Sequence, residues 1–204
     1  MTHADDDSAH RGTRLASPGD CADPERLFLD LIAPPPALAI FGAGDDAQPL
    51  ARLARELGWH ITVADPRAAF ATAARFPEAN ALVVGRADEL VARAAPSADG
   101  LAVVMTHHYV HDVPILRDLL ARPLAYLGLL GPKKRAEKIL ADLENESGVI
   151  VTSAQRARLH APVGLDLGAD APEQVALSML AEMQAALTGR DARPLRERTR
   201  PIHE

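Results

Sequence analysis

The stretch Phe41-Gly42-Ala43-Gly44-Asp45-Asp46-Ala47 decides the fold that we predict for this chain. An apolar run at 38–41 leads into it, and the segment 48–57 behind it repeats leucine and alanine at the spacing of one helix face. A G-x-G-x-x-A turn between a buried strand and an amphipathic helix is typical of a dinucleotide-binding βαβ unit. The sequence therefore predicts a Rossmann-type turn here.

The residues of this turn have separate roles in such a unit. Gly42 permits the tight turn, Gly44 lets the backbone approach a phosphate, and the start of the helix offers unpaired N–H groups to an anion. Asp65 ends the next predicted strand, 61–64, where an acid usually accepts hydrogen bonds from ribose hydroxyls. Asp45 and Asp46 would repel a pyrophosphate that they faced, so we expect them to point away or to coordinate a cation. A tight turn that binds nothing, with both acids satisfying the helix dipole, is the alternative.

The rest of the chain continues the alternation of short apolar runs and amphipathic segments. Further strands are predicted at 81–84, 101–105 and 124–127. Further helices are predicted at 68–75, 88–95, 112–121 with Asp112 as its cap, 132–145, and 172–187 with Asp170 and Glu173 at capping-box spacing. This order predicts an α/β fold, a Rossmann-like, doubly wound and mainly parallel sheet with helices on both faces.

Composition divides the chain into four parts. Residues 1–23 are polar without periodicity and are expected to form a disordered tail. Residues 24–36 form a short helix or strand followed by the proline triplet of a stiff linker. Residues 37–190 form the Rossmann-like domain, and 191–204 form a C-terminal tail.

The overall composition excludes several classes of protein. The 204 residues are 48% apolar and 25% charged, which is ordinary for a globular protein. With 3% aromatic residues and a formal charge of −6, the chain lacks the features of a nucleic-acid binder. No apolar run approaches the roughly 18 residues of a membrane span. The lone Cys21 fits a reducing compartment, and the acidic N-terminus does not resemble a signal peptide, so we expect a cytoplasmic protein.

Three other loops fall at the edge of the sheet where the glycine turn lies. Thr106 and His107 open a histidine-rich loop in which His107 and His111 are four residues apart, as metal ligands on one helix face can be. Because no second ligand cluster accompanies them, we expect a polar, hydrogen-bonding loop and no metal.

Gly131 precedes Lys133, Lys134 and Arg135, three cations in the first turn of a helix, where the dipole disfavours positive charge. An anionic ligand would resolve that conflict, and a solvated charge run is an equally good interpretation. The glycine-rich segment 160–169, with Gly164 and Asp166, indicates backbone that passes close to a ligand or a neighbouring strand, although an ordinary tight loop would look similar.

Seven segments together resemble, in order, the Rossmann domain of the XdhC/CoxI family over about residues 36–204. None of them is decisive alone, but the ordered set is highly specific. The segments are 40–47 (IFGAGDDA), 63–67 (VADPR), 75–77 (RFP), 105–107 (MTH), 128–135 (GLLGPKKR), 161–169 (APVGLDLGA) and 178–182 (SMLAE).

The resemblance implies a maturation factor, a cofactor-binding chaperone without catalytic residues. Such proteins bind molybdenum cofactor as molybdopterin or molybdopterin dinucleotide, assist its sulfuration, and deliver it to a molybdenum hydroxylase of the xanthine dehydrogenase or CO dehydrogenase type. A sulfurtransferase partner and a homodimer are also implied, and the pyrophosphate of the dinucleotide form suits the glycine turn. The positions implied to bind the cofactor are Gly42, Gly44, Asp45, Asp46, Asp65, Arg67, Thr106, His107, Gly131, Lys133, Lys134, Arg135, Gly164 and Asp166.

Two other functions share the glycine turn. One is an NAD(P)-dependent oxidoreductase, although no separate substrate domain and no Tyr/Lys or Cys/His catalytic pair is evident. The other is a nucleotide-sensing binding module. Full-length members of the family also carry an N-terminal domain with cysteine motifs, and only 24–36 resembles its end. We therefore expect a partial, regulatory or split member, in which Cys21 lacks neighbours that would lower its pKa.

Overall fold

The computed structural model describes residues 14–15, 28–29, 33–146, 150–199 and 201. The chain divides into two units, residues 1–35 and 36–204. In the first, β1 (Arg14–Leu15) pairs antiparallel with β2 (Phe28–Leu29). Apart from these two strands, the predicted tail at 1–23 and the segment 24–32 lie outside the described residues.

The second unit is built on a six-stranded, all-parallel sheet in the order β5-β4-β3-β6-β7-β8. The chain enters at β3 in the middle, moves outward through β4 to β5, and returns to β6 on the other side of β3. This order confirms the predicted doubly wound Rossmann-like fold, and it places the topological switch point between β3 and β6. The strands are β3 (Ala37–Phe41), β4 (His60–Asp65), β5 (Ala81–Val84), β6 (Leu101–Val104), β7 (Tyr126–Leu129) and β8 (Leu159–His160).

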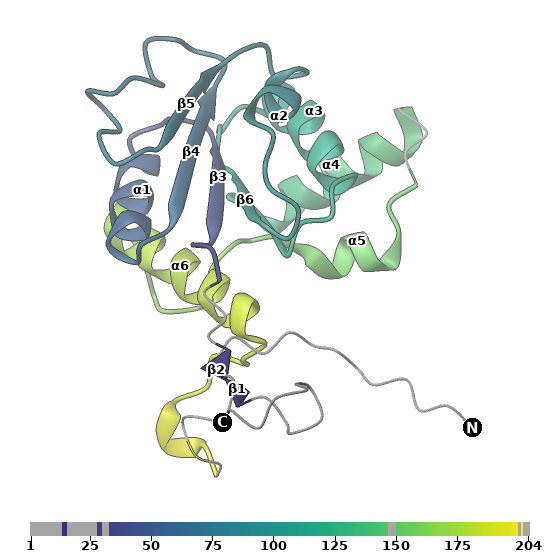
Figure 1. Cartoon of the computed structure of the whole chain (residues 1–204). Helices are drawn as coiled ribbons and strands as arrows, with labels where there is room; N and C mark the ends of the chain where they lie inside the picture. Colours follow the sequence, from purple (N-terminus) through teal and green to yellow (C-terminus); the bar gives the residue numbers. More distant parts are fainter. Residues whose placement is uncertain (1–13, 16–27, 30–32, 147–149, 200, 202–204) are drawn as a thin grey trace, which may run out of the picture. The chain divides into compact units, whose positions relative to one another are not determined.

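Helices cover both faces of the sheet. On one side lie α1 (Ala47–Glu56) and α6 (Pro172–Thr188), and on the other α2 (Leu90–Ala94), α3 (Tyr109–Leu120) and α4 (Lys133–Glu146) (Figure 1). A short helix, α5 (Ser153–Arg158), leads into β8, and a single 3-10 turn (Leu195–Glu197) follows α6. Among the described helices, none is both long enough and apolar enough to cross a bilayer.

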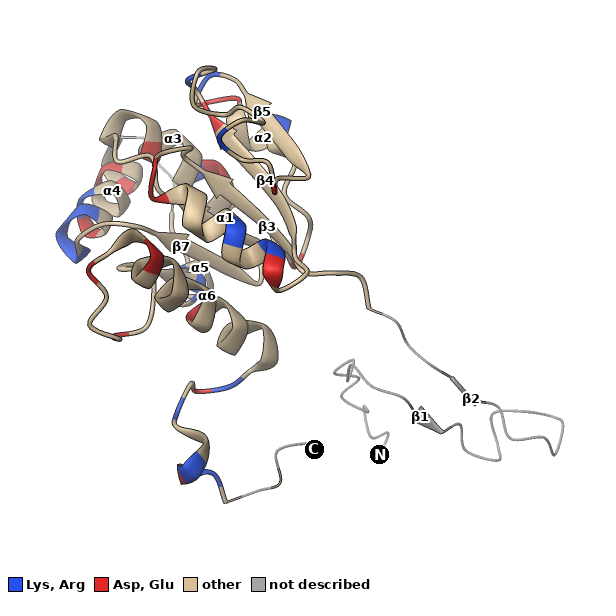
Figure 2. Ribbon diagram, turned by 90° about the vertical axis from the view of Figure 1, so that its left-hand side faces the viewer, with Lys and Arg blue, Asp and Glu red and all other residues tan. Residues whose placement is uncertain are grey.

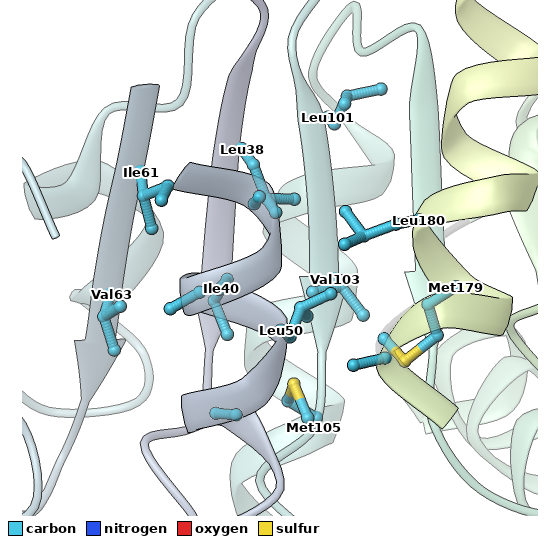
Figure 3. Close-up of a cluster of buried hydrophobic side chains, with 14 of the residues drawn as sticks. Leu38, Ile40, Leu50, Ile61, Val63, Leu101, Val103, Met105, Met179 and Leu180 are labelled. Carbon is cyan, nitrogen blue, oxygen red and sulfur yellow. The ribbon is translucent and has the colours of Figure 1, made fainter. Parts of the chain in front are cut away.

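Two hydrophobic cores follow from the alternation of side chains along the central strands. In β3, Leu38 and Ile40 face the core under α1 and α6, whereas Ala39 and Phe41 face the core under α2, α3 and α4. Figure 3 shows the first core, where Leu50 of α1 and Met179 and Leu180 of α6 lie over Leu38, Ile40 and Val103 of the sheet. Because both faces are covered, the central strands read as continuous apolar runs.

The prediction of a helix at 68–75 is wrong. That segment forms successive turns, closed by hydrogen bonds from the N–H of Phe70 to the carbonyl of Arg67 and from the N–H of Phe76 to that of Thr72. Its alanines favour a helix, but Arg67 is bound to Asp65 and its guanidinium lies over Phe70. At its other end, Arg75 donates to the carbonyl of Ala43 and to Asp45, and these local and tertiary contacts together override the helix propensity.

Several predicted boundaries also move. Asp112 does not cap α3, because the helix begins at Tyr109 with His108 as its N-cap and Asp112 is buried in the first turn. The strand predicted at 124–127 lies two residues later, at β7. At the start of α6 the Gln174 carboxamide oxygen, rather than Glu173, accepts from the N–H groups of Asp170 and Ala171.

Candidate functional site

The loops that follow β3 and β6 meet at the switch point. The N–H of Met105, after β6, donates to the carbonyl of Phe41 (2.8 Å), and the N–H of Gly42 donates to the carbonyl of Ala64 (2.8 Å). In sheets of this topology, ligands bind beyond the carboxyl ends of the strands at this point. The predicted glycine turn and the histidine loop therefore lie side by side where a ligand is expected.

Gly42 is required by the close approach of these two loops. Its φ of +117° lies in the region that favours glycine, and a Cβ atom there would lie 2.5 Å from the carbonyl oxygen of Met105. Gly44 is different, because a Cβ would lie 2.6 Å from Asp46 Oδ1, the end of a side chain that can move. Gly42 thus serves the fold, and Gly44 keeps free the space in front of the turn.

The turn presents hydrogen-bond donors. Within the described residues, no hydrogen bond reaches the N–H groups of Gly44, Asp45 and Asp46, and no side chain caps α1. Unpaired N–H groups before a helix attract anions, and the helix dipole adds to that attraction. The turn can therefore hold a phosphate group.

The two acids of the turn each have a partner from another segment. Asp45 Oδ1 accepts from Arg75 Nη2 (2.8 Å) and from Gln48 Nε2 (3.1 Å). Asp46 Oδ2 accepts from His107 Nε2 (2.6 Å), which links the loops after β3 and β6. The repulsion that the sequence predicts for a bound pyrophosphate is therefore reduced by the Arg75 guanidinium beside Asp45.

Asp65 is completely buried at the end of β4 and accepts four hydrogen bonds. Oδ2 accepts from the N–H of Ala43 (2.7 Å) and from Arg67 Nη2 (2.8 Å), and Oδ1 accepts from the N–H (2.7 Å) and Nε (2.9 Å) of Arg67. Burial acts to raise the pKa of Asp65, but the hydrogen bonds from Arg67 and Ala43 outweigh it and hold that pKa below its ordinary value. All four of these hydrogen bonds to Asp65 thus come from other residues of the same chain.

Arg67 and Arg75 both lie against the ring of Phe70. The Arg67 guanidinium carbon is 3.8 Å from the ring centroid and that of Arg75 is 5.1 Å away. Arg75 also donates to the carbonyl of Ala43 (3.2 Å), and its Nε is buried without a hydrogen-bond partner among the described residues. Sequence reasoning missed Arg75 and Phe70, although the segment 75–77 was already part of the family resemblance.

Thr106 belongs to a buried polar cluster behind the histidine loop. Its hydroxyl donates to Asp112 Oδ1 (2.5 Å), and Arg135 donates to the other oxygen of Asp112 and to the carbonyl of His107 (3.4 Å). Asp112 is 1% exposed, so Arg135 supplies the charge that this carboxylate needs. One of the three cations at the start of α4 is therefore held by the protein.

Lys133 and Lys134 remain exposed, and neither forms an ion pair with another described residue. Figure 2 shows basic residues along α4. Gly131, which precedes them, has a φ of +134°. These two lysines are the cations of the predicted site that stay available to a ligand or a partner.

Gly164 and Asp166 are not joined to the glycine turn by any hydrogen bond or ion pair between described residues. The N–H of Gly164 donates to Glu182 Oε2 (2.8 Å), and a Cβ at Gly164 would lie 2.5 Å from Ser178 Oγ, so its close approach is to α6. Glu182 also accepts from the hydroxyl of Tyr126 (2.5 Å), and burial together with this hydrogen bond raises the pKa of Tyr126. Asp166 is exposed.

Metal ligation was an alternative for the histidine loop. His107 is held by Asp46, and the rings of His108 and His111 lie 5.4 Å apart. Over the described ranges, no group of three or more His, Cys, Asp or Glu side chains is placed to hold a metal ion.

Known proteins are similar to this chain in sequence and fold. The family model described as the XdhC Rossmann domain matches residues 38–183. A protein of Bacillus subtilis, named as a probable xanthine dehydrogenase subunit, is 36% identical over 157 residues, which are 77% of this chain and 44% of that protein. The Escherichia coli protein named "uncharacterized protein YqeB" is 30% identical over 165 residues, 80% of this chain and 30% of that protein.

A solved structure is similar as well. A crystal structure described as a xanthine dehydrogenase from Bacillus halodurans superposes with a TM-score of 0.68 at 30% identity, covering 77% of this chain and 46% of that one. The chain thus spans less than half the length of these relatives. The family match covers most of the chain and includes the glycine turn, Asp65 and both loops after β6 and β7. The chain therefore belongs to the XdhC family, and its residues 38–183 form that family's Rossmann domain.

Proposed function

We propose that this chain binds molybdenum cofactor, as molybdopterin or molybdopterin dinucleotide, and assists its sulfuration and insertion into a molybdenum hydroxylase of the xanthine dehydrogenase or CO dehydrogenase type. The observation that carries the proposal is the glycine turn at the switch point of a chain of the XdhC family, where three N–H groups have no hydrogen-bond partner in the described part of the chain. The name of the Bacillus subtilis relative supports a xanthine dehydrogenase client.

The residues present fit the phosphate part of such a cofactor. Gly44 keeps the space in front of the turn free of a side chain, and the N–H groups of residues 44–46 can donate to phosphate oxygens. Lys133 and Lys134 can add positive charge from the start of α4. The bound cofactor supplies the molybdenum chemistry of the client, while this chain's residues bind and orient it.

Two partners complete the proposal. A sulfurtransferase would supply the sulfur, and a second copy of the chain would form a homodimer. Because the chain spans less than half of its relatives, the contacts with client and sulfurtransferase need not lie within the described residues. Sedimentation of the purified chain tests the dimer, with a monomer at all concentrations as the contradicting result.

The central test is binding by purified protein. We expect mass spectrometry to detect molybdopterin, or its nucleotide form, released from chain purified out of cells that make the cofactor. Gly44→Val should lose this ligand and keep the fold, because the atom nearest to the new Cβ belongs to the Asp46 side chain and not to the backbone. Gly58→Ala is a control outside the turn, since no atom lies within 4 Å of a Cβ there, and its φ of +76° adds backbone strain without a clash. A folded Gly44→Val protein that retains the ligand would contradict the proposed site.

A further inference from the structure

We propose that the guanidinium of Arg67, supported by Phe70, is a stacking subsite for the heteroaromatic ring of a nucleoside diphosphate, and that Asp65 does not recognise the ribose of this ligand. The inference rests on the proposed function, because the glycine turn must hold the phosphates.

The first step concerns Asp65. An ionised carboxylate offers about four positions to hydrogen-bond donors. Four donors from Ala43 and Arg67 already occupy Asp65, and the side chain is completely buried. A ribose hydroxyl would have to displace Arg67 from a buried charge, which is unfavourable because it breaks a charge-assisted pair. The acid at the end of β4 is therefore committed to the fold.

The second step concerns Arg67. Its Nε and Nη2 edge is bound to Asp65 and the guanidinium lies 3.8 Å from the Phe70 centroid, yet 37% of the side chain remains exposed. Asp65 holds one edge of the guanidinium and Phe70 lies on one of its faces, so we place the ring of the ligand on the opposite face. A guanidinium that is fixed in this way loses little freedom when a planar ring stacks on it. Arginine planes are common partners of unpaired bases.

The third step is the position of this surface. The same oxygen, Asp65 Oδ2, accepts from the N–H of Ala43 in the glycine turn and from Arg67 Nη2. Arg75 makes a second link, since it donates to Ala43 and Asp45 and lies against Phe70. The phosphate site and the Arg67 surface are thus neighbours, as a base and the phosphates of one nucleotide require. Because Asp65 and Asp45 balance the charges of these two arginines, the attraction for the phosphates comes from the N–H groups of the glycine turn.

The test compares ligands by calorimetry on the whole chain. Inorganic pyrophosphate reports the glycine turn alone, and ADP, GDP and CDP add a ribose and a base. The 2′-deoxy forms should bind within about twofold of the ribose forms, because Asp65 does not reach the hydroxyl. Arg67→Lys keeps the charge but loses the plane, so it should weaken each nucleotide about tenfold and leave pyrophosphate within about twofold.

One further variant is a control and another is a second test of the subsite. Arg86→Lys changes an exposed arginine that pairs with Asp88 at the same two-residue spacing, and it should leave all affinities unchanged. Phe70→Leu removes the flat support but keeps an apolar side chain, and it should weaken nucleotides selectively, as Arg67→Lys does. Thermal melting of each variant verifies that the fold is intact.

The outcomes separate the two proposals. If pyrophosphate binds but Arg67→Lys and Phe70→Leu do not alter nucleotide affinity, the stacking subsite is wrong and the phosphate site stands. If the ribose forms bind more than about fivefold tighter than the deoxy forms, Asp65 recognises the ribose and the inference is overturned. If neither pyrophosphate nor any nucleotide binds, the proposed function fails and this inference fails with it.

Discussion

Gly42 and Gly44 occupy comparable places in the sequence pattern, but the structure gives them different neighbours. Gly42 combines a φ of +117° with a backbone oxygen 2.5 Å from the position of a Cβ, whereas the atom nearest to a Cβ at Gly44 belongs to a side chain. The same motif therefore contains one glycine that the fold needs and one that, under the proposed function, leaves room for the ligand. Separate substitutions can distinguish these roles.

We expect Gly42→Ala to lower the free energy of unfolding by about 3 kcal/mol, from backbone strain and a clash that the backbone must relieve. Gly58 has a φ of +76° but open space around the position of a Cβ. Gly58→Ala should therefore lower the free energy of unfolding through backbone strain alone, by about 1 kcal/mol. Urea denaturation of both variants measures the difference. Equal losses would show that the approach of Met105 to Gly42 is not tight.

Asp65→Asn tests the buried carboxylate. We expect a loss of about 2 kcal/mol at pH 7, because charge-assisted hydrogen bonds from Arg67 and Ala43 disappear. The pKa of Asp65 is lower in the folded chain than its ordinary value of 3.8, so its ionised form stabilises the fold above that pH. This stabilisation is lost as the pH falls through the lower pKa that Asp65 has in the folded chain.

The difference in unfolding free energy between wild type and Asp65→Asn should therefore shrink below about pH 3.8. Urea denaturation at pH 7 and pH 3 measures it. Asp88→Asn, which removes the exposed partner of Arg86, is the control and should change stability little at either pH. A difference for Asp65→Asn that does not vary with pH would contradict this account.

At the scale of elements, the sequence predicts correctly those strands and helices that a periodic pattern of apolar residues marks. The central strands are covered on both faces, so their positions follow from short apolar runs, and the strand predicted at 81–84 coincides with β5. β8 was missed because it has only two residues, and α5 because Thr152 caps a helix with no buried residues. Elements that are this short, or that bury no residue, produce no recognisable pattern of apolar residues in the sequence.

The site was predicted only in part, for a related reason. The glycine spacing, the acid at position 65 and the basic start of α4 are local patterns that a sequence displays. The pairing of Asp46 with His107 joins residues 61 positions apart, and that of Arg135 with Asp112 joins residues 23 apart. Which partner satisfies which charge depends on tertiary packing, so the sequence could not assign these pairs.

Lys134→Glu tests the start of α4. Lys134 is exposed without an ion pair among described residues, so its reversal should change stability by no more than about 0.5 kcal/mol. We expect weaker pyrophosphate binding and a smaller dependence of the affinity on salt. Arg52→Glu, an equal charge reversal at an exposed position of α1, is the control. If Lys134→Glu alters neither affinity nor salt dependence, the run is a solvated surface.

At the scale of the whole Rossmann unit, segments far apart in sequence are tied together at the switch point. Asp46 of the glycine turn binds His107 after β6, and Ala43 binds both Asp65 at the end of β4 and Arg75 of the following loop. A ligand at the turn would contact this network directly. A substitution in any of the three loops is therefore expected to act on the same bound molecule.

The last prediction separates a cofactor chaperone from a dehydrogenase, which could use the same turn. A dehydrogenase needs a group that exchanges a proton as hydride moves. The histidine loop is the candidate source, and His107 is half exposed beside the turn. We expect co-expression of the chain to raise the activity of a molybdenum hydroxylase client, and His107→Ala to weaken this effect because Asp46 loses its partner. We also expect no turnover of NAD(P)H with common alcohols, aldehydes or hydroxy acids.

His111→Ala is the matched control, since His111 lies in the same loop but does not bind Asp46. His111→Ala should leave the activation of the client enzyme unchanged. His107→Ala should reduce that activation, in a variant whose melting temperature equals that of the wild-type chain. The opposing measurement is absorbance at the reduced nicotinamide band. Sustained turnover that depends on His107, in protein that carries no molybdopterin, would exclude the chaperone function, because the turn and the histidine would then serve hydride transfer.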